Sequence, residues 1–237
     1  MTLLEVNNLK KVYTSRFGGA PVQALSNVSF SVEEGEYLAI MGESGSGKTT
    51  LLNILAALDK PTSGEVLLDG KLLSAIKERD ISAFRRDNLG FVFQDFNLLD
   101  TFTLRDNIFL PLVLARKPYS FMRGELQPIA EKLRIEDVLD KFPYEVSGGQ
   151  KQRAAVARAL ITHPKLILAD EPTGNLDPVR SLELMLLLEK INELGTTVLV
   201  VTHEKELVDA FSKRVISIDT GRVVSDGLDG YYGYEAE

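Results

Sequence analysis

The sequence contains no cysteine and only two histidines, His163 and His203, in 237 residues. The absence of cysteine excludes disulfides, cysteine-based metal sites and a thiol nucleophile. Any histidine chemistry must therefore involve His163 or His203. His163 directly precedes Pro164, and we expect it to be a solvated turn residue rather than a functional one.

Long apolar segments are also absent. The longest apolar stretches, such as residues 184–188 and 198–201, are far shorter than the roughly 20 residues that a membrane-spanning helix needs. The first residues lack the basic segment and apolar run of a secretion signal. We therefore expect a cytoplasmic chain that would lie on the inner face of the cell membrane only through a partner.

Excess positive charge is lacking as well. The net charge is −7 and the isoelectric point is about 5.1, whereas proteins that grip phosphate backbones usually show a basic footprint. We therefore expect no nucleic-acid partner. The apolar fraction of 44% and the charged fraction of 26% are ordinary for a folded protein.

Four short apolar runs predict buried strands, and each ends beside a polar residue or loop. The runs cover residues 37–41, 89–93, 166–169 and 197–201. They show little alternation and are separated by helical stretches, which is typical of a parallel sheet covered on both faces. The polar positions that follow them are Gly42, Gln94, Asp170 with Glu171, and His203. Ligands bind at the carboxyl ends of such strands, so these positions are expected to meet.

The remaining segments predict two additions to this core. Residues 3–6, 28–32 and 65–68 are expected to form an antiparallel β layer, and residues 104–115, 125–133 and 150–161 are expected to be helices. We expect one domain over 1–237. Its core would comprise 1–94 and 162–225, with an inserted helical lobe over 95–161 and a flexible tail over 226–237.

The segment from Gly42 to Thr49, here called the phosphate loop, has the pattern G-x4-G-K-[ST] between a predicted strand and a helix expected to begin near Lys48. Glycines let successive N–H groups point inward as an anion nest at the helix start. Lys48 would reach the β and γ phosphates, and Thr49 offers a hydroxyl to Mg²⁺. The residues expected to bind nucleotide are Gly42, Glu43, Ser44, Gly45, Ser46, Gly47, Lys48, Thr49 and Thr50. A glycine-rich turn without function is the alternative.

Two acids follow the third predicted strand. Asp170 suits a water-mediated Mg²⁺ ligand, as in other P-loop enzymes. Glu171 suits a general base that takes a proton from the attacking water. Together these residues predict a P-loop NTPase of α/β class, with a doubly wound, mainly parallel sheet, an antiparallel β subdomain and an inserted α-helical subdomain. An acidic turn before Pro172 is the structural alternative, and a small-molecule kinase is not excluded by the phosphate loop alone.

A second helix start lies at Ser147, Gly148, Gly149 and Gln150, here called the signature loop. Ser147 with Gln150 three residues later fits a capping box, which is a purely structural role. Unpaired amides at this helix start would also favour a γ-phosphate. The two roles are compatible.

These motifs resemble those of ABC transporter ATPases over nearly the whole chain. The matching segments are the phosphate loop, residues 93–95, 146–153, 168–173, 175–177 and 202–203. Val146 stands where the family usually has leucine, which is a conservative change. The resemblance implies ATP and Mg²⁺ as ligands, and Lys48, Gln94, Glu171 and His203 as catalytic residues.

The same resemblance implies roles for single residues. Tyr13 would stack on adenine, Gln94 would join the network of Mg²⁺ and attacking water, and His203 would contact the γ-phosphate. Thr49, Gln94 and Asp170 would hold the metal. The structural alternatives are a strand aromatic for Tyr13, a loop amide for Gln94 and a helix-entry residue for His203.

A head-to-tail dimer is also implied, in which the signature loop of one copy closes over the ATP held by the other. Asp177 would contact the partner copy. Because Pro178 follows it, Asp177 also fits the N-cap of a helix that Gly195 ends. A second copy of the chain is thus an expected partner.

Finer details resemble the macrolide-export and lipoprotein-release branch, and most of all the bacitracin-type antimicrobial-peptide resistance transporters of Gram-positive bacteria. The segments that carry this are residues 13–19, 53–61, 91–100 and 107–112. An integral membrane permease is implied as partner, and often a sensor kinase through it. We expect the permease to contact Phe96, Leu98, Leu99 and Phe102, although these side chains could simply pack the helical lobe.

Two alternatives stay open at this point. Residues 233–235 resemble the cell-division ATPase of the same branch. ABC-type ATPases that act on nucleic acid or ribosomes are a different class, but they usually carry a coiled-coil insertion, a zinc module or a second ATPase domain, and the sequence shows none of these.

Overall fold

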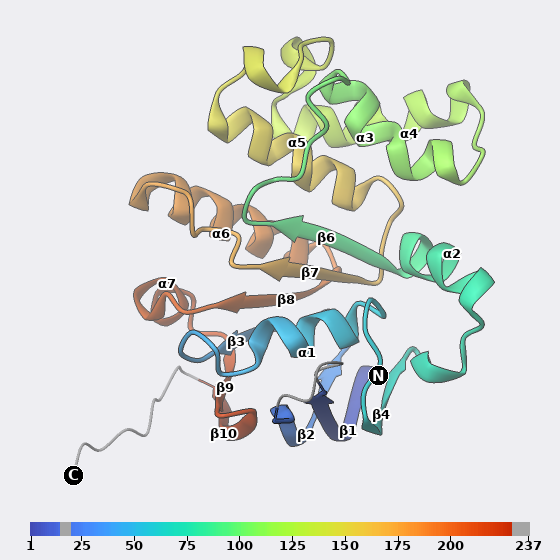
Figure 1. Cartoon of the computed structure of the whole chain (residues 1–237). Coiled ribbons are helices and arrows are strands. Elements are labelled where there is room, and N and C mark those ends of the chain that lie inside the picture. The colour runs from blue at the N-terminus through green and yellow to red at the C-terminus, as the bar shows by residue number, and fades with distance from the viewer. Residues whose placement is uncertain (15–19, 229–237) are drawn as a thin grey trace.

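The computed structural model describes residues 1–14 and 20–228, whose strands form two sheets (Figure 1). The strands are β1 Thr2–Tyr13, β2 Val22–Glu33, β3 Tyr37–Met41, β4 Ser63–Leu68, β5 Lys71–Leu72, β6 Leu89–Phe93, β7 Leu166–Asp170, β8 Thr197–Thr202, β9 Arg214–Asp219 and β10 Arg222–Leu228. The larger sheet has the order β10-β9-β3-β8-β7-β6, and the smaller has the order β2-β1-β4-β5.

The larger sheet is parallel from β9 to β6, and β10 is its antiparallel edge. The four predicted core strands are confirmed as β3, β6, β7 and β8. Strands β9 and β10 were not predicted. Since β10 continues to Leu228, residues 226–228 belong to the sheet and not to the predicted tail. The rest of that tail, 229–237, lies outside the described residues.

The smaller sheet is antiparallel throughout. It contains the three short strands that were predicted, but β1 and β2 each extend over 12 residues. Register shifts interrupt the pairing of β1 with β2, so the regular alternation of apolar residues is confined to short segments. The predicted antiparallel layer is confirmed.

Alternate side chains of the central strands enter two different cores. On β7, Ile167 packs toward the helices and Leu168 toward the smaller sheet; on β8, Val198 and Leu199 divide in the same way. All four residues are at most 1% exposed. Both faces of these strands are covered, which explains why their sequences are apolar without alternation.

The helices are α1 Lys48–Leu55, η1 Leu73–Ala75, α2 Glu78–Asn88, α3 Leu104–Leu114, α4 Tyr119–Leu133, η2 Glu136–Val138, η3 Pro143–Glu145, α5 Gly148–Leu160, α6 Pro178–Glu193 and α7 Lys205–Phe211. Helices α3, α4 and α5 form the predicted helical lobe at one edge of the larger sheet, beyond β6 (Figure 1). Helix α4 begins six residues before the predicted start at 125. In the part of the chain that the structure describes, no helix combines the length and apolarity required to cross a membrane.

Candidate active site

The phosphate loop joins β3 to α1 and forms a cradle of backbone at the start of that helix. Helix α1 begins at Lys48, and no side chain of residues 1–14 or 20–228 caps its first turn. Gly47 has a φ of 106°, and a Cβ there would lie 2.5 Å from the Ala24 carbonyl oxygen. A Cβ on Gly42 would lie 2.2 Å from the Ile218 carbonyl oxygen. The close approach therefore requires glycine at both positions, and the uncapped N–H groups are left for an anion.

Lys48 lies buried within this cradle. Its Nζ donates to the carbonyl oxygens of Gly42 at 2.7 Å and Glu43 at 2.9 Å. Ser46 is also buried, and its hydroxyl has no hydrogen-bond partner among residues 1–14 and 20–228. Buried polar groups are normally paired. A phosphate group at the helix start would accept hydrogen bonds from both side chains, so the cradle fits a nucleotide phosphate.

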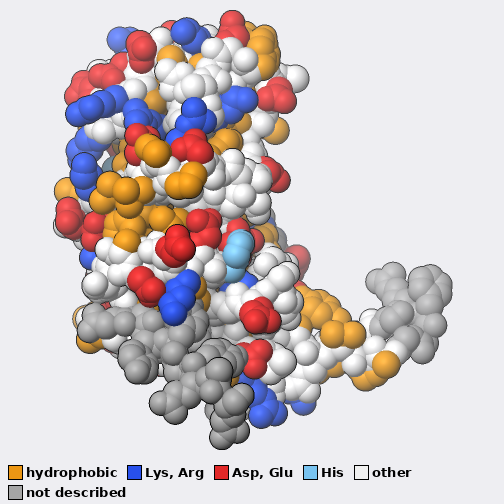
Figure 2. All heavy atoms as spheres, turned by 90° about the vertical axis from the view of Figure 1, so that its left-hand side faces the viewer, with side chains coloured by type: hydrophobic (Ala, Val, Ile, Leu, Met, Phe, Trp, Pro, Cys, Tyr) orange, Lys and Arg blue, Asp and Glu red, His pale blue; other side chains and the backbone are white. Residues whose placement is uncertain are grey.

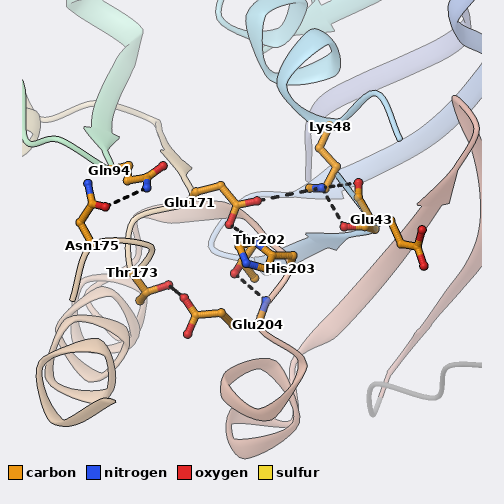
Figure 3. Close-up of polar contacts among 10 residues, drawn as sticks. Glu43, Lys48, Gln94, Glu171, Thr173, Asn175, Thr202, His203 and Glu204 are labelled. Atoms are coloured by element: carbon orange, nitrogen blue, oxygen red, sulfur yellow. Dashed lines mark hydrogen bonds and ion pairs between the residues drawn. The ribbon is translucent and has the colours of Figure 1, made fainter. Parts of the chain in front are cut away.

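Glu171 lies between Lys48 and His203 at the edge of the cradle (Figure 3). Its Oε2 is 2.8 Å from His203 Nδ1, and its Oε1 is 4.0 Å from Lys48 Nζ. Since an ionised carboxylate only accepts hydrogen bonds, Nδ1 carries the proton in this pair. Glu171 has a φ of 44°, and its N–H donates to the Val201 carbonyl at 2.8 Å. This left-handed turn, unfavourable for a residue with a side chain, directs the carboxylate out of the strand end.

Asp170, the last residue of β7, has a different environment. Its Oδ1 is buried and unpartnered in the described part of the chain. Burial raises the pKa of this carboxyl above its usual value, the charge of Glu171 adds to the rise, and Lys48 opposes it. A hard cation would supply the missing partner, and carboxylate and hydroxyl oxygens are ligands that Mg²⁺ accepts. Asp170 and the exposed hydroxyl of Thr49 therefore fit such an ion.

Gln94 follows β6 and belongs to a chain of amide contacts. Its Nε2 donates to Asn175 Oδ1 at 3.2 Å (Figure 3). Asn175 Nδ2 in turn donates to Asp95 Oδ1 at 2.7 Å. A Cβ on Gly174 would lie 2.8 Å from Gln94 Nε2. The Gln94 side chain is thus packed against the turn that follows β7, which carries Asp170 and Glu171.

A cavity of about 1110 Å³ opens at the carboxyl ends of the strands. Figure 2 shows the face of the molecule at these carboxyl ends, where acidic side chains lie near a histidine. The predicted residues that line the cavity are Gly42, Glu43, Ser44, Gly45, Gly47, Lys48, Thr49, Thr50, Glu171 and His203. Of the positions predicted to meet after the four strands, Gly42, Glu171 and His203 line this cavity, whereas Gln94 and Asp170 are not among its described lining residues.

Part of the lining was not predicted. Residues 22–24 of β2 and 217–219 of β9 contribute to the cavity, and so does Val224 of β10. No motif marks these positions. The apolar run at 215–218 is the signal that would have revealed β9, but nothing in it indicates which residues meet the phosphate loop.

Tyr13 is not among the described residues that line the cavity. Its hydroxyl donates to Asp59 Oδ2 at 2.9 Å, and Lys11 Nζ lies 4.8 Å from its ring centroid. Its backbone pairs with Val22, which does line the cavity. Tyr13 thus lies one strand away from the cavity with its ring 41% exposed, and stacking on adenine stays a prediction.

The signature loop lies apart from the cradle, at the start of α5. Ser147 Oγ accepts from the Gln150 N–H at 3.3 Å, and Gln150 Oε1 accepts from the Ser147 N–H at 3.0 Å. The predicted capping box is therefore confirmed. None of the four signature residues is among the described residues that line the cavity. Within one chain, the two predicted halves of the site are separate.

Asp177 begins α6 as predicted. Its Oδ1 accepts from the Arg180 N–H at 3.1 Å, and its side chain is 51% exposed. Gly195, with a φ of 100°, follows the end of the helix. The N-cap role is confirmed, and contact with a partner copy stays a prediction.

Comparison with known proteins shows which family the chain resembles. Residues 25–174 match the family model described as ABC transporter. The uncharacterized ABC transporter ATP-binding protein YvcR of Bacillus subtilis is 50% identical over 227 residues, which is 95% of this chain and 87% of that protein. The bacitracin export ATP-binding protein BceA of Halalkalibacterium halodurans is 42% identical over 94% of this chain and 87% of its own length. The cell division ATP-binding protein FtsE of Bacillus subtilis is 39% identical over 95% of this chain and 97% of its own length.

A solved structure is similar in fold. The ATP-binding cassette MJ0796, in a dimeric post-hydrolysis state bound to ADP and Pi, gives a TM-score of 0.84 at 38% identity, over 97% of this chain and 100% of that one. The predicted P-loop α/β fold is confirmed by this similarity. With these matches in length and identity, the chain belongs to the ABC transporter ATP-binding family.

Proposed function

We propose that this chain binds ATP and Mg²⁺ and hydrolyses ATP to ADP and phosphate, with Glu171 as the general base. The observation that carries the proposal is the position of Glu171. Its carboxylate lies between buried Lys48 and the His203 ring, at the mouth of an uncapped helix start. An acceptor for the proton of water thus adjoins the place where a γ-phosphate would be held.

In the proposed reaction, the phosphate oxygens replace the Gly42 and Glu43 carbonyls as acceptors for Lys48 Nζ. Hydrogen bonding to His203 Nδ1 fixes the Glu171 carboxylate, and His203 would donate to a γ-phosphate oxygen through Nε2 when both ring nitrogens carry protons. Glu171 accepts a proton from the attacking water. Mg²⁺, held by Thr49, Asp170 and Gln94, would neutralise charge on the transferred phosphoryl group.

We infer that the complete site needs two copies of the chain. The signature loop lies at a helix start capped by an exposed Ser147, and its other residues are half-buried. It does not contribute to the described lining of the cavity of its own chain. An ATP held by the phosphate loop of one copy would meet Ser147 and Gly149 of the other, with Asp177 near the junction. The similarity to a dimeric ATP-binding cassette supports this arrangement.

We also infer that an integral membrane permease docks beside the helical lobe. Leu99 and Phe102 are 44% and 40% exposed, whereas Phe96 and Leu98 are half-buried. A cavity of about 340 Å³ reaches the same loop at Asn97. Its lining combines apolar residues, such as Phe93 and Leu114, with three arginines, Arg85, Arg86 and Arg158. Exposed apolar side chains around such a cavity are typical of an interaction site.

We infer that the chain serves a transport system for antimicrobial peptides. Similarity to BceA supports a bacitracin-type antimicrobial-peptide resistance or export system, with the chain on the cytoplasmic face of the membrane and a sensor kinase reached through the permease. Similarity to FtsE supports the alternative of a cell-division role. The permease that the chain captures would decide between them.

Glu171→Gln tests the chemistry. Glutamine keeps the size and the hydrogen bond to His203 but does not accept a proton, so hydrolysis should fall by about 100-fold or more while ATP binding persists. The ATP-bound dimer should accumulate and elute earlier from a sizing column. Unchanged turnover in this variant would contradict the assignment of the base.

Leu114→Glu tests the docking surface. Leu114 is 67% exposed and lines the 340 Å³ cavity, so a charge there should weaken capture of the permease from membranes without unfolding the chain. Val113→Glu is the matched control, because Val113 is 51% exposed on the same helix but is not part of the described lining. Capture of ribosomes or DNA instead of a permease would refute the transporter assignment.

A further inference from the structure

The turn that contains Gln94 is hydrogen-bonded by an arginine side chain of helix α5. Arg158, in the last turn of α5, donates from Nη2 to the Phe96 carbonyl at 2.7 Å and from Nη1 to the Asn97 carbonyl at 2.5 Å. No acidic side chain pairs with Arg158 in the described part of the chain. Its hydrogen bonds are therefore directed at the backbone of this turn.

The held backbone is tight and unfavourable by itself. Phe96 and Asn97 have φ values of 59° and 48°, a left-handed conformation that residues with a side chain rarely adopt twice in succession. The Phe96 N–H donates to the Phe93 carbonyl at 3.1 Å. Gln94 lies inside this turn, so the clamp on Phe96 and Asn97 also fixes the position from which the Gln94 side chain projects.

Arg158 is suited to this task by its surroundings. It is half-buried among the helical lobe, and burial lowers the pKa of its guanidinium. A planar guanidinium offers several donors in a fixed fork and can hold two neighbouring carbonyls at once. The hydrogen bond to the Phe96 carbonyl is partly buried, whereas the one to the Asn97 carbonyl is exposed. Loss of the side chain therefore leaves the Phe96 carbonyl poorly paired, while water can reach that of Asn97.

The position of Arg158 joins three parts of the molecule. It lies on α5, the helix that begins with the signature loop, about 16 Å along the helix axis from Ser147. With Asn97 and Phe93 it lines the 340 Å³ cavity proposed to receive the permease. Arg158 therefore links the signature helix and this cavity to the turn of Gln94, in addition to the direct packing of α5 against β6.

We propose that Arg158 is a positioning residue for hydrolysis, which acts through the Phe96 and Asn97 carbonyls to hold Gln94 in place. The proposal rests on the function proposed above, in which Gln94 helps to arrange Mg²⁺ and the attacking water. Arg158 touches neither nucleotide nor metal in this scheme. It couples the signature helix and the docking cavity to the catalytic turn.

The first test separates positioning from a merely structural role. In the purified full chain, Arg158→Met should lower kcat by about tenfold and raise the Mg²⁺ concentration for half-maximal activity, with KM for ATP within about twofold. Arg158→Lys, which keeps a charged donor, should lie between Arg158→Met and the unaltered chain. Arg123→Met is the matched control, because Arg123 is an exposed arginine of the same lobe. If Arg158→Met merely reduced the folded fraction, the Mg²⁺ concentration for half-maximal activity would not move, and the proposal would be overturned.

The second test is a double-mutant cycle with Gln94→Ala. If Arg158 acts through Gln94, Arg158→Met should have little further effect on kcat once Gln94 is alanine. If the two losses multiply, Arg158 acts by another route and the positioning role is refuted while the function of Gln94 stands. If Gln94→Ala alone leaves kcat unchanged, the role of Gln94 under the proposed function fails, and the positioning role fails with it.

Discussion

Two neighbouring carboxylates, Asp170 and Glu171, have different environments although they share one strand end. Glu171 is paired with His203 and adjoins Lys48. Asp170 has a buried oxygen without a partner among the residues that the structure describes. Its pKa is raised, first by burial and then by the charge of Glu171. The protein thus places one acid where it can accept a proton and another where a bound cation would supply the missing partner.

Asp170→Asn should therefore stabilise the nucleotide-free chain while it abolishes Mg²⁺-dependent hydrolysis. Asparagine removes the buried charge but keeps an unpaired buried oxygen, so the gain should be at the low end of the cost of such a group, about 1 kcal/mol. For a chain of this size this corresponds to about 2–4 °C in Tm. Thermal unfolding and ATPase assays measure the two effects. Asp100→Asn, the same charge change at an exposed position, should alter neither.

The gain in thermal stability from Asp170→Asn should depend on pH. Because the folded-state pKa of Asp170 is raised, the folded chain holds this proton more tightly than the unfolded chain, and ionisation above the usual value of 3.8 weakens the fold. The Tm difference between Asp170→Asn and the unaltered chain should thus grow as pH rises from about 4 through the raised pKa. A difference that shrinks with rising pH would contradict the burial of an unpaired carboxylate.

Among the elements, the loop from β6 to α3 is held by two helices. Asn107 of α3 is fully buried, accepts from the Leu99 N–H at 2.7 Å and donates to the carbonyls of Leu99, Phe102 and Thr103. Arg158 of α5 holds the other end. The loop therefore has a defined shape without regular secondary structure, and it presents Leu99 and Phe102 to solvent.

Two substitutions of Ser147, the N-cap of α5, can separate its capping role from the proposed contact with nucleotide. Ser147→Ala removes the N-cap and should lower the free energy of unfolding by about 0.5–2 kcal/mol. Ser147→Asp keeps a good N-cap but places a negative charge where the partner's phosphate is proposed to bind. Both variants should lose hydrolysis, and urea unfolding should show that only Ser147→Ala is less stable. Full activity of Ser147→Asp would contradict the phosphate role of the signature loop.

At the scale of the whole molecule, the cavity and the signature loop of one chain do not meet. The cavity lies at the carboxyl ends of the core strands, whereas Ser147 begins the helix of the lobe beyond β6 (Figure 1). One chain therefore supplies half of each of two sites in the proposed dimer.

Mixing two inactive variants tests this directly. Lys48→Ala should disable the phosphate loop, and Ser147→Asp should disable the signature loop. In a mixed dimer, one site combines the intact phosphate loop of one chain with the intact signature loop of the other. Random pairing makes half of the dimers mixed, so ATPase activity should recover to about a quarter of the unaltered rate. A Lys48→Ala chain mixed with the Lys48→Ala, Ser147→Asp double variant should show no recovery.

Local patterns in the sequence determined much of this protein. The phosphate loop, the Ser147 capping box, the Asp177 N-cap and the parallel strands all follow from short segments, because backbone geometry and capping depend on neighbouring residues. The positions of β9 and β10, the cavity wall at 22–24 and 217–219 and the pairing of Tyr13 with Asp59 depended on the tertiary structure. These contacts join segments far apart in the chain, and no local pattern encodes which distant residues will pack together. The same holds for Arg158, an ordinary helical residue in sequence, whose guanidinium reaches the turn of Gln94 only once α5 is packed against β6.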